Sequence, residues 1–166
     1  GFKTQSYATD PVAATAAWSS GGNVNTARYG PGHLGIQTAA LKFGGTPPAT
    51  ADAEEYNGTS WSEISDIGSA RYSISGFGTT AAGVLAGGTP NSTLVQTWNG
   101  SAWSSGTAIS TGRAAAGGIG TSTAGMIVGG IAPDKGETEV YNGSAWTESG
   151  DLTTPRGSAV VAGTTT

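Results

Sequence analysis

The 166-residue sequence contains no cysteine and a single histidine. Without cysteine the chain has no disulfide, no thiolate nucleophile and no cysteine ligand for zinc. The lone histidine, His33, has no second histidine that could form a metal pair with it, so we expect an ordinary hydrogen-bonded polar group. Neither a metal nor any other cofactor is therefore expected.

Charge is also scarce. Charged residues make up 11% of the chain, the net charge is -4, and lysine and arginine form no cluster. Binding to nucleic acid through its phosphates requires several concentrated cations, so nucleic acid is not an expected partner. No apolar run approaches the roughly 18 to 20 residues of a membrane-spanning helix, and no charged-then-apolar secretion signal opens the chain. No membrane partner is expected either.

The chain is instead rich in small residues. It has 29 glycines beside abundant alanine, serine and threonine, a composition that favours short strands and tight turns over long helices. Such residues bury little apolar area each, so similar layers must stack closely. The 5 tryptophans, 5 tyrosines and 3 phenylalanines are expected to anchor those layers.

A tryptophan is followed ten residues later by an arginine four times, which defines a repeat of 42 to 43 residues. The pairs are Trp18/Arg28, Trp61/Arg71, Trp103/Arg113 and Trp146/Arg156. Each complete repeat also has a di-glycine, at Gly44-Gly45, Gly87-Gly88 and Gly129-Gly130, and an aromatic residue before Asn-Gly, at Tyr56, Trp98 and Tyr141. We expect the tryptophans and the di-glycines to form the structural framework of the repeat.

One repeat is predicted to form four antiparallel strands. In the third repeat, two small or apolar runs, a polar-apolar alternation and a returning run predict strands at 114–121, 124–128, 137–141 and 145–148. Asn142-Gly143 predicts a type I′ hairpin turn between the last two, because that turn requires positive φ at both central residues. In the first repeat the first strand is expected at 34–38.

These features predict an all-β fold, a β-propeller of four-stranded antiparallel blades. Inner strands of glycine and alanine suit blades that converge on an axis, whereas a β-solenoid would need much shorter coils. The expected single domain, 1–166, has a partial blade at 1–20, complete blades at 28–63, 71–105 and 113–149, and the first strand of a further blade at 156–163.

The order of di-glycine, aromatic residue, tryptophan and arginine resembles the kelch repeat. WD40 repeats have a similar period, but no tryptophan here is followed by aspartate and no Gly-His opens a unit. The compact form, with its "YNGTSW" and "WNGSAW" turns, is similar to kelch-like repeats in proteins of tailed phages and in environmental viral proteins. The resemblance implies a propeller located in a virion or outside the cell.

The two ends of the chain are incomplete repeats. Residues 3–20 align with the third and fourth strands of a blade, and residues 156–162 align with a first strand only. A blade made from both ends would lack its second strand. This favours a segment of a larger ring or assembly over a closed four-bladed ring, with protein partners or further copies of the chain completing the propeller.

Two sets of repeated residues are candidates for ligand binding. Arginines can bind an anion or a carboxylated sugar, and aromatic rings can stack on sugars. The arginines are Arg28, Arg71, Arg113 and Arg156, and the aromatic residues are Tyr56, Trp98 and Tyr141. Glu54, Gln96 and Glu139 recur two residues before the aromatic ones, so we favour a structural role in which these acceptors hold the arginines. Packing between blades is likewise favoured for the tryptophans.

No catalytic residue is predicted. His33 has no recognisable nucleophile motif near it, and the acidic residues recur with the repeat, unlike the unique pair that a glycosidase needs. Four asparagines also begin glycosylation sequons: Asn57, Asn91, Asn99 and Asn142. A turn requirement explains three of these sequons, and whether any of the four carries a glycan stays open.

The sequence thus predicts a non-enzymatic structural or adhesive module of a larger assembly, a virion or a secreted surface structure. One alternative is a carbohydrate-binding propeller, for which surface glycans would be the ligands. A second alternative is a protein–protein adaptor. Its partners would contact the loops at 46–52, 89–93 and 131–136, because these differ between repeats while the framework does not.

Overall fold

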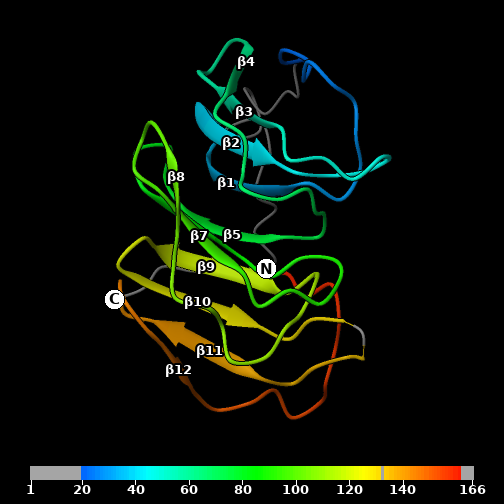
Figure 1. Ribbon diagram of the computed structural model, residues 1–166, viewed down its shortest axis with the longest axis vertical. Coiled ribbons are helices and arrows are strands. Elements are labelled where there is room, and N and C mark those ends of the chain that lie inside the picture. Colours follow the sequence, from blue (N-terminus) through cyan, green and yellow to red (C-terminus); the bar gives the residue numbers. More distant parts are fainter. Residues whose placement is uncertain (1–19, 132, 162–166) are drawn as a thin grey trace, which may run out of the picture.

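The computed structural model describes residues 20–131 and 133–161 of the chain. Within these ranges the chain forms twelve strands and no helix, so none of its described elements is a helix that could cross a membrane. The strands form three four-stranded antiparallel sheets, which follow one another along the long axis of the molecule (Figure 1). The predicted all-β class and the four-stranded repeat are confirmed.

Each sheet is a meander whose strands pair in chain order. The first unit consists of β1 (Gly32–Ile36), β2 (Ala39–Phe43), β3 (Ala53–Tyr56) and β4 (Trp61–Ile64). The second consists of β5 (Ser75–Gly78), β6 (Gly83–Ala86), β7 (Val95–Trp98) and β8 (Trp103–Ser105). The third consists of β9 (Gly117–Thr121), β10 (Ala124–Val128), β11 (Thr138–Tyr141) and β12 (Trp146–Glu148). Trp18 and most of the predicted partial blade at 1–20 lie outside the described residues.

Two predicted first strands are wrong in their bounds. The strand expected at 34–38 runs from Gly32 to Ile36, because Ile36 pairs with Ala39 and the two residues between them form the turn. The strand expected from residue 114 begins only at Gly117. Ala115 has a φ of 51°, which interrupts extended backbone there.

The predicted type I′ turns at Asn-Gly are also wrong. In the first unit only the glycine of the pair has a positive φ, 92° at Gly58, and the loop has four residues between β3 and β4. The side-chain oxygen of Asn57 accepts hydrogen bonds from the backbone N–H groups of Thr59 and Ser60, both at 3.0 Å. The asparagine therefore shapes the loop through its side chain, as in an Asx turn.

The first strands of successive units lie side by side, β5 against β1 and β9 against β5. Glycine permits this approach. A Cβ atom on Gly76 would lie 2.5 Å from the carbonyl oxygen of His33, and one on Gly118 would lie 2.9 Å from that of Gly76. The short distance between neighbouring sheets therefore explains why these strands are built from small residues.

Apolar side chains fill the spaces between the sheets. One cluster lies between the first and second units and includes Phe43, Leu85 and Trp98, and a second lies between the second and third units and includes Phe77 and Tyr141. In each cluster a phenylalanine meets a framework tryptophan edge to face, with centroids 5.5 Å apart for Phe43 and Trp103. Trp103 also donates through its indole N–H to Ser65 O at 2.9 Å, which ties the two units together.

Candidate functional site

The repeated arginines lie between the start of one unit and its third strand. Arg113 is 1% exposed, and its guanidinium donates to the carbonyl oxygens of Thr111, Gly129 and Glu137. It also forms an ion pair with Glu139, with 2.6 Å between Nη2 and Oε1. The second carboxylate oxygen of Glu139 accepts from the backbone N–H of Ser110 at 2.8 Å. One buried ion pair therefore connects the entry of the third unit to its di-glycine and its third strand.

The first unit repeats this arrangement and adds a lysine. Arg28 donates to Thr26 O, Gly44 O and Asp52 O, and its Nη2 lies 3.1 Å from Oε1 of Glu54. Lys42, on β2, reaches the same Glu54 oxygen at 2.9 Å. Burial raises the pKa of Glu54, but hydrogen bonds from Lys42 and the Asn25 backbone outweigh it and leave that pKa below its usual value. Glu54 is therefore ionised at neutral pH. Nothing in the repeat pattern marks Lys42, because the other units carry leucine and isoleucine at its position.

The second unit has the arginine but not the carboxylate. Arg71 is 2% exposed and donates through Nη2 to the amide oxygen of Gln96 at 3.0 Å, while its Nε and Nη1 have no hydrogen-bond partner in the part of the chain that the structure describes. Burial lowers the pKa of its guanidinium to about 10, so the group remains charged at neutral pH. The second unit therefore contains a buried positive charge with which no carboxylate among the described residues forms an ion pair.

We expect the substitution Gln96→Glu to raise the free energy of unfolding by about 1–3 kcal/mol, because it supplies the charged acceptor that the other two arginines possess. Urea denaturation of the variant and the parent chain measures this difference. Ala81→Glu is the control. It adds the same charge to the second unit at an exposed position that does not line the cavity with Gln96, and we expect a change within about 0.5 kcal/mol. A Gln96→Glu variant no more stable than the parent would contradict the expectation.

The candidate aromatic residues lie at the same place in each unit, paired with the framework tryptophan. Centroid distances are 5.1 Å for Tyr56 and Trp61, 4.9 Å for Trp98 and Trp103, and 4.8 Å for Tyr141 and Trp146. Trp98 and Tyr141 are 4% and 3% exposed, so their rings offer no open face to a sugar, whereas Tyr56 is half-buried. The structure thus brings each aromatic residue to its tryptophan and places the arginines separately.

Arg156 has the backbone position of the other arginines without their surroundings. Gly130 N donates to Arg156 O at 3.0 Å, just as Gly88 N donates to Arg113 O at 2.9 Å. The Arg156 Nε donates to Thr154 O, as the equivalent atom of Arg113 does to Thr111 O. Arg156 is nevertheless exposed, because no di-glycine strand or third strand lies over it among the described residues. The first strand predicted at 156–163 is wrong for its described part, because residues 156–161 form no strand and Ser158 has a φ of 52°. Residues 162 and 163 lie outside the described residues.

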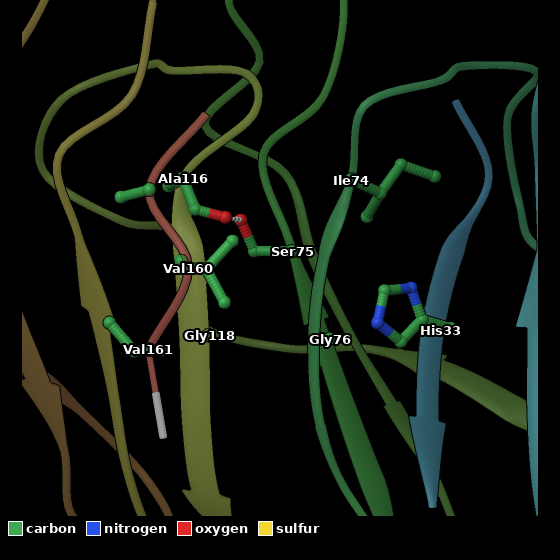
Figure 2. A pocket seen from close by; sticks show the side chains of 10 residues that line it. His33, Ile74, Ser75, Gly76, Ala116, Gly118, Val160 and Val161 are labelled. Atoms are coloured by element: carbon green, nitrogen blue, oxygen red, sulfur yellow. Dashed lines mark hydrogen bonds between the residues drawn. The ribbon is translucent and has the colours of Figure 1, made fainter. Parts of the chain in front are cut away.

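A small cavity of about 140 Å³ lies where the first strands approach one another. His33 lies at one side of it, and Val160 and Val161 lie at the opposite side beside Gly118 (Figure 2). Its middle is formed by Ser75, whose hydroxyl donates to the Ala116 carbonyl oxygen at 2.8 Å. Among the residues that the structure describes, no group of three or more metal-ligating side chains is placed to hold an ion, and the cavity that His33 borders has no arginine in its lining.

A second depression lies over the loops that vary between units. It has a volume of about 370 Å³ and is lined by Tyr72, Thr89, Pro90, Ala114 and Ile131 from the second and third units. Short bridges join Tyr72 to Thr89 and Ala114 to Ile131 at this end of the sheets. The loops singled out for the adaptor alternative therefore share one end of the molecule with this depression.

No protein-family profile matches this chain, and no curated protein matches it. The case for a function therefore depends on the geometry of the repeat.

Proposed function

We propose that the chain is a non-enzymatic, kelch-like β-propeller module, structural or adhesive, in a larger assembly such as a virion or a secreted surface structure. One observation carries the proposal. Residues 156–161 lie against the third unit, where the first strand of a fourth unit would lie. We infer that a partner protein or another copy of the chain contributes the other strands of that unit.

Backbone hydrogen bonds and close contacts hold this segment against the third unit. Arg156 N donates to Lys135 O at 3.1 Å, which matches the 3.3 Å bond from Arg113 N to Ser92 O one unit earlier. A Cβ atom on Gly117 of β9 would lie 2.8 Å from Ala159 O. The segment therefore continues the succession of β1, β5 and β9 without a second strand among the described residues.

The exposure of Val160, compared with the equivalent residues of the complete units, supports a partner chain at this segment. The residue four places after the arginine is buried in all three complete units, as Gly32, Ser75 and Gly117. The fourth is Val160, which is 95% exposed. A cavity of about 450 Å³ lies along this segment and is lined by Val128, Leu152 and Arg156. An exposed valine on an unpaired segment beside a sheet is a surface onto which another strand can add.

Native mass measurement tests this proposal. We expect the native particle to exceed the 16.3 kDa of this chain. We expect Val160→Asp to weaken the association more than about 100-fold, because burying an unpaired charge costs several kcal/mol. Ile36→Asp is the matched control, since Ile36 is 68% exposed on a strand that already has its partner, and it should leave the mass unchanged. A native species of 16.3 kDa, identical in the parent and the Val160→Asp variant, would refute the proposal.

A further inference from the structure

The second unit differs from the other two at four equivalent positions around its arginine. These positions lie nine and seven residues before the framework tryptophan and two and five residues after it. The first unit carries Asp52, Glu54, Glu63 and Asp66, the third carries Glu137, Glu139, Glu148 and Asp151, and the second carries Leu94, Gln96, Ser105 and Ala108. All four acidic side chains are thus absent from the second unit, although its arginine is retained.

In the third unit these acidic side chains satisfy nearby donors. Glu139 pairs with Arg113, Glu148 accepts from the Ser110 hydroxyl at 3.3 Å, and Asp151 accepts from the Thr138 N–H at 3.3 Å. In the second unit the neutral replacements leave a cavity of about 190 Å³, lined by Gly68, Ser69, Leu94, Val95, Gln96 and Ser105, among others. The cavity therefore lies where the other units place their carboxylates.

The amide of Gln96 links this cavity to the buried charge. Its oxygen accepts from Arg71 Nη2 at 3.0 Å and from the Gly68 N–H at 3.2 Å, and both of these partners are donors. The amide nitrogen of Gln96 is also a donor, and it is available to a ligand in the cavity that this residue lines. Arg71 lies behind Gln96 with two unpartnered nitrogens. The polar side of the cavity thus presents donors next to an uncompensated positive charge, and Leu94 and Val95 supply an apolar side.

We propose that this cavity binds a small monocarboxylate with a short aliphatic body. The carboxylate accepts from the Gln96 amide nitrogen and from the hydroxyl groups of Ser69 and Ser105, and its charge compensates Arg71. The aliphatic part contacts Leu94 and Val95. The cavity of about 190 Å³ has room for several water molecules at about 30 Å³ each, and so for a small ligand such as butyrate. This site is separate from the segment at 156–161 and does not depend on the assembly proposed above.

Titration of the ¹⁵N-labelled chain with sodium butyrate at constant sodium concentration tests the site, with butyramide as the neutral probe of the same shape. We expect saturable shifts of the Gly68 and Ser69 amide signals with butyrate and none with butyramide. Gln96→Glu should weaken butyrate binding at least about tenfold, because its own carboxylate takes the place of the ligand. Equal responses to butyrate and butyramide, or no saturable shift at Gly68 and Ser69, would overturn the proposal.

A second variant tests the site independently of whether Gln96→Glu folds. Ala108→Asp restores an acidic residue at an exposed position beside the cavity, where the other units have Asp66 and Asp151. It should weaken butyrate binding in the same direction. Ala81→Asp adds the same charge at an exposed position away from the cavity and should leave binding unchanged. Butyrate affinity that is the same in Ala108→Asp as in the parent chain would also reject the site.

Discussion

Replacing Glu139 with alanine is expected to lower the free energy of unfolding by about 3–5 kcal/mol, because it leaves Arg113 as an unpaired charge in the interior. Arg113 and Glu139 each have 1% of the side chain exposed, so water cannot take over the lost interaction. The substitution also removes the acceptor of the Ser110 N–H. Since a domain of this size is typically stable by about 5–15 kcal/mol, the loss is a large fraction of the whole.

Urea denaturation measures this effect, with Glu148→Ala as the control. Glu148 is exposed and accepts one bond of 3.3 Å from the Ser110 hydroxyl, so its loss should cost less than about 1 kcal/mol. Glu139→Gln should fall between the two, because an amide oxygen can still accept from Arg113 as Gln96 does from Arg71. If Glu139→Ala and Glu148→Ala were equally mild, the buried pair would not stabilise the third unit.

Much of the fold can be predicted from the repeat alone. The positions of the di-glycines, aromatic residues and tryptophans predict four strands per unit, and the structure has four in each of the three complete units. The strand bounds were harder to predict because small residues favour no particular backbone conformation strongly. Ala115 and Ser73 both adopt a positive φ, 51° and 53°, although neither residue type favours it.

The reason for this strained backbone lies between units. The Ala115 N–H donates to Ser73 O at 2.8 Å, and the Ser73 N–H donates to Gly30 O at 2.6 Å. Each unit therefore fixes the backbone of the next at the residue two places after its arginine. No property of alanine or serine in the sequence reveals this, because it depends on the contact between neighbouring sheets.

The candidate residues were predictable to a similar extent. The spacing identified Glu54, Gln96 and Glu139 as recurring acceptors, and each contacts the arginine of its own unit. Their burial could not be read from the sequence, since glutamate and arginine are usually exposed. The repeat pattern does not predict the cavity that Gln96 lines, although the loss of four acidic residues in one repeat is visible in the aligned units.

Replacing Gly87, in the second di-glycine, with alanine is expected to lower the free energy of unfolding by about 3 kcal/mol or more. Both the left-handed backbone and the steric overlap of the added Cβ atom destabilise the fold. Gly87 has a φ of 72°, and a Cβ atom there would overlap the carbonyl oxygen of Arg113. That oxygen accepts the Gly88 N–H at 2.9 Å, a bond that joins the second unit to the third. The added methyl group would therefore strain its own strand end and also separate two sheets.

Thermal or urea unfolding of three glycine variants tests this explanation. Gly150→Ala is the neutral control, since a Cβ atom at Gly150 has no atom within 4 Å, and its change should stay within about 0.5 kcal/mol. Gly129→Ala has the same backbone strain, with a φ of 66°, but its Cβ would lie 2.7 Å from the Arg156 oxygen. In the chain diluted below the concentration at which it associates, the segment at 156–161 lacks a second strand among the described residues and can move away, so Gly129→Ala should then cost less than Gly87→Ala. Equal costs at Gly87 and Gly129 would mean that backbone strain alone decides the effect and that contact with the next unit adds nothing.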